Sequence, residues 1–312
     1  MHKWKTQDIP DQTGKVFLIT GANSGLGYEC SRILARKGAT IVMAVRTPSK
    51  GEAARLSILK ETPDAQIDVM QADMASLSSI RAFADAFKAA YDRLDVLCNN
   101  AGVMAIPRQE TEDGFEMQLG VNHLGHFALT GLLMDVLAAT PGARIHNVTS
   151  SANWTGSIQF DDLMLKEDYG RWASYGQSKL ANIFFTFELQ KRLDAAGQNI
   201  IANTSHPGLV MTNLQANSVE QSDAGAEQFL YNLIGPLIAQ DVSMGVLPML
   251  YGMTAPQAKG GEFYGPRLFR VRGYPTEQKA NEEAYDADAL RRFWEISAEL
   301  TGVDYDLSQA PA

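Results

Sequence analysis

Residues 15–27 read KVFLITGANSGLG, and this stretch indicates the fold of the chain. Residues 15–20 form a short apolar run, which is typical of a strand buried on both faces of a sheet. Gly21, Gly25 and Gly27 follow at once. Glycines permit a tight turn, and a helix that starts there presents free N–H groups to an anion. The spacing GxxxGxG differs from the commoner GxGxxG, and a plain loop would also accept it. Its position after an apolar strand favours a phosphate-binding turn.

The rest of the chain continues the alternation that this turn begins. Helices are expected at about 25–37, 50–61, 77–91, 111–139, 173–196 and 284–300. Strands are expected at 15–20, 40–45, 66–71, 94–98, 143–149, 199–205 and, more weakly, 260–264. This order predicts a single α/β domain, with a Rossmann-type, doubly wound parallel sheet of about seven strands flanked by helices. In such a sheet the ligand crevice lies at the carboxyl ends of the strands.

Composition limits the classes of partner and compartment. The 312 residues carry a formal net charge of −9 and contain no basic block, so no nucleic acid partner is expected. Cys30 and Cys98 lie far apart in the sequence, and neither a disulfide framework nor a metal site is expected. Residues 1–14 are polar, and no apolar run approaches the roughly 20 residues of a membrane span. We therefore expect a soluble, cytoplasmic protein with no membrane partner.

Four further motifs lie at the ends of expected strands or on expected helices. Asn99-Asn100-Ala101-Gly102 follows the fourth strand, Asn122 lies on the next helix, and Tyr175 and Lys179 share a later helix. Pro207-Gly208 follows the sixth strand. Together with the glycine turn, these motifs resemble, in kind and order, those of the short-chain dehydrogenase/reductase family over residues 20–212. The resemblance implies an oxidoreductase that interconverts a carbonyl (aldehyde or ketone) and an alcohol by hydride transfer from a nicotinamide dinucleotide.

The catalytic residues that the resemblance implies are Asn122, Ser150, Tyr175 and Lys179. Tyr175 and Lys179 are four residues apart on one helical face, and a nearby ammonium favours the phenolate and lowers the tyrosine pKa. A phenol with its ordinary pKa of about 10 is a poor acid or base at neutral pH, so this lowering would bring proton transfer into range. An ordinary helical Tyr–Lys pair has the same spacing. The family's pattern selects Ser150 over its neighbour to steady the substrate oxygen, and Asn122 would link Lys179 to solvent through a water.

The second strand ends at Val45-Arg46 and carries no acid that would hold an unphosphorylated ribose. The planar guanidinium of Arg46 suits a 2′-phosphate, so NADP(H) is expected over NAD(H), although a solvated loop arginine is the alternative. The resemblance places Asp73 at the adenine, and the alternatives are a cap of the next helix or a solvated loop residue. The cofactor-binding residues that the resemblance implies are Gly21, Ser24, Gly25, Leu26, Gly27, Arg46, Asp73, Met74, Asn100, Ala101, Gly102, Tyr175, Lys179, Pro207, Gly208, Val210 and Thr212.

The chain departs from most family members by a long insert near 153–172, between the expected serine and tyrosine. In this respect it is similar to the retinol dehydrogenases and the WW-domain oxidoreductase. Residues 1–14 are expected to form an N-terminal extension, and 15–312 a single NADP(H)-binding domain with substrate-side segments near 153–172 and 209–259. Two other functions stay open. One is reduction of a carbon–carbon double bond, as in protochlorophyllide reductase. The other is a non-enzymatic NADPH-sensing or scaffolding role.

Several other expectations concern the substrate and the assembly. The substrate is expected to be a small, moderately apolar carbonyl or alcohol. Family members form dimers or tetramers, so a homodimer or homotetramer is expected, and the insert leaves a monomer open. Four groups of side chains complete the expectations: Met211, Met244, Met249 and Met253, lining a pliable pocket or filling the core; Arg267, Arg270 and Arg272, solvated or binding an anion; Trp154 and Trp172, bracketing the insert; and His123, His126 and His206 in structural roles.

Overall fold

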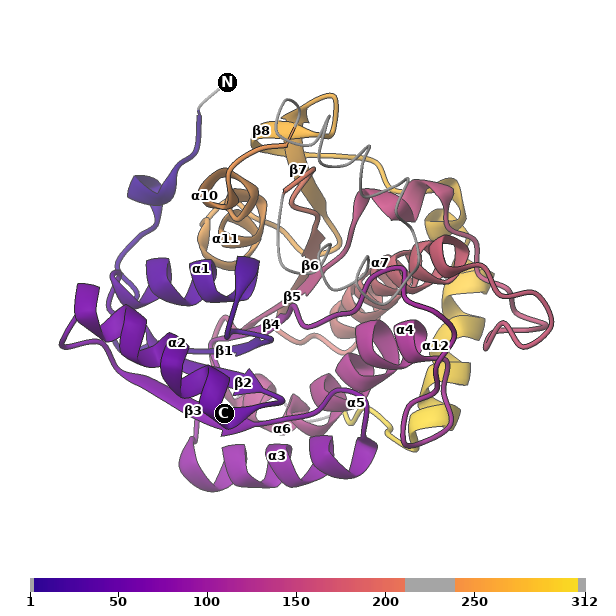
Figure 1. Ribbon diagram of the computed structural model, residues 1–312, viewed down its shortest axis with the longest axis horizontal. Coiled ribbons are helices and arrows are strands. Elements are labelled where there is room, and N and C mark those ends of the chain that lie inside the picture. The colour runs from indigo at the N-terminus through magenta and orange to yellow at the C-terminus, as the bar shows by residue number, and fades with distance from the viewer. Residues whose placement is uncertain (1–2, 211–238, 308–312) are drawn as a thin grey trace.

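A computed structural model of the chain describes residues 3–210 and 239–307. Its eight strands form one sheet in the order β3-β2-β1-β4-β5-β6-β7-β8 (Figure 1). Neighbouring strands are parallel as far as β7, and β8 is antiparallel to β7. The strands are β1 (Val16–Thr20), β2 (Thr40–Val45), β3 (Ile67–Gln71), β4 (Val96–Asn99), β5 (Arg144–Val148), β6 (Ile201–Ser205), β7 (Phe263–Leu268) and β8 (Arg272–Glu277). The doubly wound α/β fold is confirmed, and its strand order reverses between β1 and β4.

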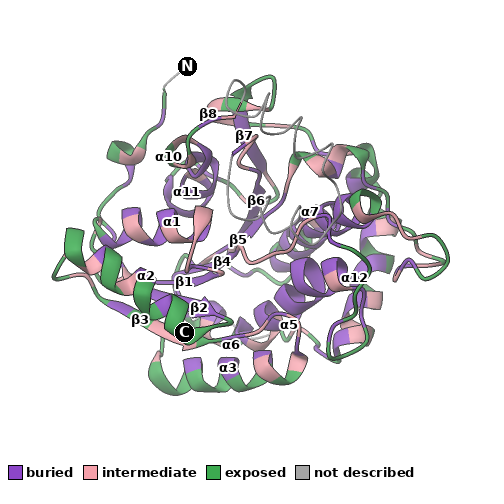
Figure 2. Ribbon diagram, in the orientation of Figure 1, coloured by how far each residue is buried: buried purple, intermediate pink, exposed green. Residues whose placement is uncertain are grey.

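Both faces of the sheet are covered, because successive side chains of a strand point to opposite faces. Val16 and Leu18 of β1 pack into one apolar cluster, whereas Phe17 and Ile19 pack into another. The first cluster includes side chains of α3 (Leu77–Ala90), α5 (Gly125–Leu132) and α7 (Arg171–Ala195). The second includes α1 (Gly25–Ala35), α2 (Pro48–Glu61) and α11 (Leu247–Thr254). Figure 2 shows the resulting buried layer between the two sets of helices.

The expected helix at 111–139 is wrong in its start and in its continuity. Residues 110–116 form a small turn in which Glu110 bridges Glu116. Helix α4 (Met117–Leu119) starts after Glu116, whose carboxylate accepts hydrogen bonds from the backbone N–H groups of Gln118 and Leu119. The chain continues through a π-helical turn (Gly120–Leu124), α5 and α6 (Met134–Ala139). The buried Glu116 carboxylate satisfies N–H groups that a helix start leaves unpaired, and this fixes the start.

The eighth strand was not expected. The weak seventh strand is β7, and β8 follows it across a short hairpin. The sequence of β8, RGYPTE, lacks an apolar alternation, and its Pro275 has no N–H to donate. An edge strand tolerates a proline because one of its sides has no ladder to complete. The sheet therefore has one strand more than the sequence predicted.

The described part of 209–259 is short-helical, with α10 (Val242–Gly245) followed by α11. Met249 and Met253 are 0% and 1% exposed within the apolar cluster on that face of the sheet, and Met244 packs against the cluster. These methionines fill the core, as one of the two alternatives held, and Met211 lies outside the described residues. The C-terminal helix is α12 (Ala287–Thr301), which packs on α7. Among the described residues, no helix has the length and apolar character needed to cross a membrane.

Candidate active site

The glycine turn after β1 is shaped for close approach by an anion. Gly21 and Gly25 have positive φ angles of 66° and 56°, which L side chains rarely adopt. A Cβ on Gly27 would lie 2.6 Å from the Asn100 Nδ2 and 2.6 Å from the Gly21 carbonyl oxygen. Helix α1 then starts at Gly25, and the side chain of its N-cap residue, Ser24, makes no capping hydrogen bond. The first N–H groups of α1 are therefore available to a phosphate, which fits the dinucleotide expected here.

Thr20, the last residue of β1, joins this turn to the Asn-Asn-Ala-Gly segment after β4. Its Oγ1 accepts hydrogen bonds from the backbone N–H groups of Asn100 and Ala101, each at 2.9 Å. The side-chain amide of Asn100 donates in turn to the Thr20 carbonyl oxygen at 2.8 Å. One hydroxyl thus fixes two loops at the point where the strand order reverses. The side-chain amide of Asn99, by contrast, donates to Thr130 of α5 and Asn147 of β5, as in a structural residue.

His126 joins this network to Asn122. Its Nε2 lies 2.8 Å from Thr20 Oγ1, and its Nδ1 lies 3.1 Å from the carbonyl oxygen of Asn122. A carbonyl only accepts, so Nδ1 carries the proton, and Nε2 accepts from the threonine hydroxyl. Burial lowers the pKa of His126 to about 4, which keeps the ring neutral near neutral pH. The sequence predicts only a structural role for His126. It does not reveal this link, because the end of β1, the segment after β4 and the helix that carries His126 meet only in the folded chain.

Asn122 lies in the π-helical turn, a local widening that often occurs at functional sites. Its side chain is fully buried and fully bonded. The amide Nδ2 donates to the Val103 carbonyl oxygen and to Ser178 Oγ, both at 2.9 Å, and Oδ1 accepts from the Val103 N–H at 2.8 Å. The side chain therefore clamps the segment after Gly102 against α7. Both amide hydrogens are used in this way, so the expected water link to Lys179 would need the Asn122 carbonyl oxygen, which already accepts from His126, or the second lone pair of Oδ1.

Ser150 and Tyr175 form the polar part of the expected catalytic group. Ser150 follows β5 and caps the 3-10 turn Ser151–Thr155, accepting from the Ala152 N–H at 3.3 Å. Tyr175, on α7, is 5% exposed, and burial raises its pKa to about 12. A hydrogen bond from Ser150 opposes this rise by favouring the phenolate. The expectation that Lys179 lowers the tyrosine pKa below its ordinary value is wrong for the chain by itself.

Lys179 lies one helical turn after Tyr175. Its Nζ lies 5.7 Å from the centre of the Tyr175 ring and 3.4 Å from the Val148 carbonyl oxygen. Burial lowers the pKa of this ammonium to about 8. A Cβ on Gly102 would lie 3.5 Å from Nζ, so the glycine leaves the amine open toward the segment after β4. The structure thus brings Ser150, Tyr175, Lys179 and Gly102 to one place.

The ends of β2 and β3 carry the residues expected at the adenosine. Arg46 is exposed at the end of β2 and pairs with no carboxylate within the described ranges. Asp73 is half-buried, and its Oδ1 accepts from the Ala75 N–H at 3.0 Å. Helix α3 is capped by Ser76, which accepts from Ser79, so the alternative reading of Asp73 as that cap is wrong. Met74, which follows Asp73, is buried.

The segment after β6 is held from several sides. His206 Nδ1 accepts from the Gly208 N–H at 3.2 Å, and His206 Nε2 lies 3.0 Å from Gln278 Oε1. The Pro207 carbonyl oxygen accepts from Gln240 at 2.7 Å, and Gly208 has a φ of 74°. Val210 is buried against Gly245 rather than open to a ligand. His206 shapes this segment as expected, and Thr212 lies outside the described residues.

The insert between Ser150 and Tyr175 is packed on the domain. The indole of Trp154 donates to the Lys279 carbonyl oxygen at 3.1 Å, and its ring lies 5.2 Å from that of His206. Gly156 and Gly176 meet backbone to backbone, since a Cβ on Gly156 would lie 2.3 Å from the Gly176 carbonyl oxygen. Trp172 is 48% exposed, and its ring lies 6.1 Å from that of Tyr175. Trp172 is thus the exposed aromatic residue beside the phenol.

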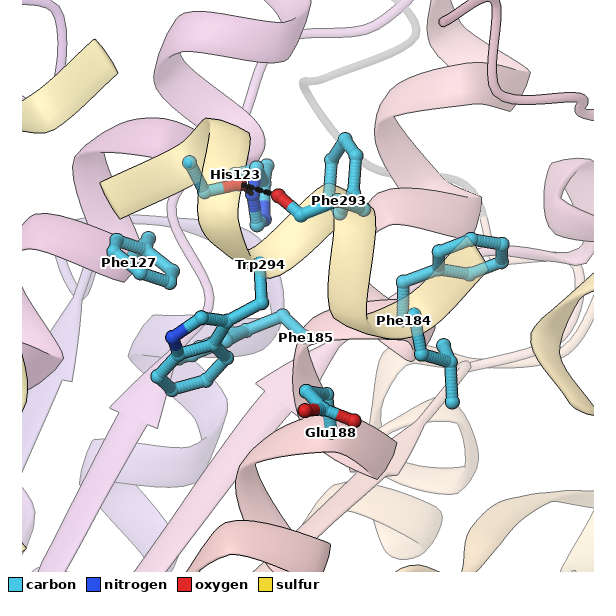
Figure 3. Close-up of a pocket in the computed structure, with 9 residues that line it drawn as sticks. His123, Phe127, Phe184, Phe185, Glu188, Phe293 and Trp294 are labelled. Atoms are coloured by element: carbon cyan, nitrogen blue, oxygen red, sulfur yellow. Dashed lines mark hydrogen bonds between the residues drawn. The ribbon is translucent and has the colours of Figure 1, made fainter. Parts of the chain in front are cut away.

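A separate cavity in the apolar core is too small to hold a ligand. Figure 3 shows it among His123, Phe127, Phe184 and Phe293, with Trp294 and Glu188 at its sides. It has no room for a water-sized molecule. His123 Nε2 lies 2.9 Å from Ser297 Oγ, and its Nδ1 is buried without a partner. The cavity is a packing gap between the π-helical turn, α5, α7 and α12.

Comparisons with known proteins place these features in context. The family model described as short chain dehydrogenase matches residues 15–223. Human retinol dehydrogenase 13 is 40% identical over 299 residues, covering 93% of this chain and 86% of that protein. Human polyprenol dehydrogenase is 34% identical, with coverages of 95% and 87%. The crystal structure of an uncharacterized protein from Mycobacterium paratuberculosis has a TM-score of 0.80 at 37% identity, covering 98% of this chain and all of the other. A short chain dehydrogenase from Shigella flexneri complexed with NADP shares the fold, with a TM-score of 0.61, 21% identity and coverages of 81% and 97%.

Proposed function

The chain belongs to the short chain dehydrogenase family, and from that premise we propose that it interconverts an alcohol and a carbonyl with NADP(H), using Tyr175 as proton donor and acceptor. The similarity to retinol and polyprenol dehydrogenases supports the general activity of an alcohol/carbonyl oxidoreductase. The single observation that supports the role of Tyr175 in proton transfer is the cluster of Ser150, Tyr175 and Lys179. The Ser150 hydroxyl opposes the burial-driven rise of the Tyr175 pKa, and the Lys179 ammonium lies 5.7 Å from the centre of the Tyr175 ring.

A bound dinucleotide supplies or accepts the hydride, and the chain's own residues handle the proton. With a pKa of about 12, the Tyr175 phenol is protonated near neutral pH and is a donor for a carbonyl oxygen. Ser150 donates to that same oxygen and holds it near the phenol. Lys179, with a pKa of about 8, carries its charge near neutral pH and stabilises the phenolate once the proton has left. Oxidation of an alcohol uses the same groups in reverse.

The preference for NADP(H) is supported by the end of β2. Arg46 is exposed there without a carboxylate partner among the described residues, and the segment after β2 begins Arg46-Thr47, without an acid. A guanidinium binds a phosphate through two parallel N–H donors, whereas an acid at that place would repel it. The glycine turn and the uncapped start of α1 would hold the pyrophosphate. Asp73 and the backbone after β4 complete the proposed cradle.

The substrate is proposed to be a moderately apolar alcohol, aldehyde or ketone. Trp172 presents an exposed indole beside Tyr175, and Trp154 lies on the turn that Ser150 caps. Retinol and polyprenol, after which the relatives are named, are apolar alcohols. An aromatic wall of this kind favours an apolar body next to a polar reacting group.

Replacement of Tyr175 by Phe tests the proposal. The variant should lose about 10²- to 10⁴-fold in kcat on a carbonyl panel read by NADPH oxidation, while its NADPH affinity stays close to that of the parent. Tyr91→Phe, at the C-cap of α3, is the matched control and should keep full activity. Product analysis distinguishes carbonyl reduction from reduction of a carbon–carbon double bond. Full turnover by Tyr175→Phe, or NADPH binding with no turnover of any carbonyl or alcohol by the parent, would contradict the proposal.

A further inference from the structure

The turn between β7 and β8 carries an unusual pair of residues at its tip. The Val271 N–H donates to the Leu268 carbonyl oxygen at 2.9 Å, which closes a four-residue turn around Phe269 and Arg270. Both central residues have positive φ angles, 52° and 60°. A hairpin turn with two positive φ angles strongly prefers Asn and Gly, because a bulky side chain strains this backbone. Backbone strain of this kind points to a task for the side chains themselves.

The apolar side chains of this tip face solvent. Phe269 is 94% exposed, and Leu268 beside it is 52% exposed. The other large apolar side chains that the described residues expose, Leu56, Trp172 and Tyr285, are each far less exposed than Phe269. An aromatic ring held out in this way gains nothing from folding, since almost none of its surface leaves water. Its position suits contact with an apolar phase outside the chain.

Positive charge surrounds the exposed ring. Arg267, Arg270 and Arg272 are all exposed, and none of them pairs with a carboxylate in the described part of the chain. The Arg270 guanidinium lies 4.3 Å from the centre of the Trp154 ring, and Lys3 lies 5.7 Å from the Tyr274 ring of β8. The whole chain has a formal net charge of −9, so this tip reverses the sign of the surface locally. Such a tip attracts an anionic surface and orients the molecule toward it.

We propose that residues 267–272 dock peripherally on an anionic lipid bilayer, with Phe269 and Leu268 entering between the headgroups and the arginines contacting lipid phosphates. A bilayer matches both features of the tip: its anionic surface attracts the arginines, and its apolar interior accepts the two apolar side chains. A symmetric contact with a second copy would instead place arginines against arginines. This docking needs no spanning helix, and it is an alternative to the expectation of no membrane partner.

The tip is joined to the candidate active site. The Leu209 N–H donates to the Val271 carbonyl oxygen at 2.9 Å, so the tip is bonded to the segment that follows Pro207-Gly208. Arg270 also rests on Trp154, on the turn that Ser150 caps. Docking would therefore bring the substrate side of the domain to the lipid. The docking does not depend on the proposed catalysis, and its test measures binding alone.

Cosedimentation of the full chain with lipid vesicles tests the proposal. The chain should sediment with vesicles of phosphatidylcholine and phosphatidylserine, and much less with phosphatidylcholine alone, and salt should weaken the binding. Phe269→Asn should weaken partitioning by about tenfold, and Arg267→Gln and Arg272→Gln by about fivefold each. Leu56→Asn on α2 and Arg291→Gln on α12 are matched controls for an exposed apolar and an exposed cationic residue, and should bind as the parent does.

The same variants show whether a loss of binding reflects damage to the fold. Asn accepts a positive φ more readily than Phe, so Phe269→Asn should melt at or above the parent temperature while it binds lipid less well. No binding to anionic vesicles would overturn the proposal, and so would equal losses in the tip variants and the controls. A concentration-dependent mass in sedimentation velocity without lipid, abolished by Phe269→Asn, would assign the tip to contact between copies and overturn it too.

Discussion

The ammonium group of Lys179 lies 5.7 Å from the centre of the Tyr175 ring and donates a hydrogen bond to the Val148 carbonyl oxygen at 3.4 Å. Among the described residues, no carboxylate pairs with this buried cation. A buried charge with so little compensation lowers the stability of the folded chain. The burial that suits Lys179 for the proposed chemistry therefore destabilises the fold.

Lys179→Met should abolish turnover and stabilise the fold. The pKa of Lys179 is lowered from 10.5 to about 8, so between these pH values the unfolded chain binds a proton that the folded chain does not. The free energy of unfolding of the parent should therefore rise with pH across this window, and the full penalty applies below about pH 8. The variant should be more stable than the parent at neutral pH by about 3 kcal/mol. Urea unfolding at several pH values checks this, and an unchanged pH slope in the variant would refute the lysine's part.

Gly27→Ala should weaken dinucleotide binding. The new Cβ would fall 2.6 Å from both Asn100 Nδ2 and the Gly21 carbonyl oxygen, so the turn after β1 must shift. NADPH affinity should drop at least about tenfold, which corresponds to about 1.4 kcal/mol. Fluorescence titration of NADPH measures this drop. Gly142→Ala is the control, because that glycine has a positive φ of 71° but nothing near its Cβ. Equal affinities for the two variants would argue against a phosphate-binding turn.

Arg46→Glu should reverse the choice of dinucleotide. The substitution replaces a phosphate-binding guanidinium by an acid that repels a 2′-phosphate and accepts from a ribose hydroxyl. The ratio of kcat/KM for NADPH to that for NADH should fall by about 10²-fold or more, because NADPH loses its phosphate contact while NADH gains a hydrogen bond to its ribose. Lys50→Glu, a few residues later on α2, makes the same change of charge and should shift the ratio only slightly. A ratio that responds equally to both changes would reflect the general surface potential alone.

His123→Leu should flatten the response of stability to acid. Burial lowers the pKa of His123 from 6.5 to about 3, so the unfolded chain binds a proton between these values and the folded chain does not. The parent should lose stability as pH falls below about 6.5, and at about pH 5 this group accounts for about 2 kcal/mol of the loss. The Ser297 hydroxyl keeps a partner in the variant, because it donates to the Phe293 carbonyl oxygen. Thermal unfolding from neutral pH to about pH 5 measures the difference, and a constant offset between the two proteins would disprove it.

The strand–helix order of the fold could be predicted because the parallel strands carry continuous apolar runs. Strand β2 occupies 40–45, as expected, and the ends of β1, β3 and β6 agree as well. Strand β8 could not be predicted, since an edge strand such as RGYPTE is specified by its neighbour β7 rather than by its own pattern. The break in the expected helix at 111–139 also escaped the sequence reading. It depends on the buried Glu116 carboxylate and on a π-helical turn, and local periodicity shows neither.

The candidate site could be predicted where its residues follow one another along the chain. The pair Tyr175 and Lys179 and the glycine turn are of this kind. Thr20 and His126 could not be recognised, because their importance comes from hydrogen bonds between residues about a hundred positions apart in sequence. The pKa of Tyr175 was expected to fall on account of Lys179. Burial outweighs that effect in the chain by itself, and burial of a side chain is a property of the whole fold.

The backbone contact between Gly156 and Gly176 has a mechanical consequence. No side chain separates the two chain segments at this point, so we expect residues 150–156 and the first turns of α7 to move together. The Arg270 guanidinium of the β7–β8 turn stacks on Trp154, which lies in the first of these segments. A displacement of the turn that reaches Trp154 should therefore move both segments as a unit. We therefore expect the distance between the Ser150 hydroxyl and the Tyr175 phenol to stay the same when the β7–β8 turn contacts another surface.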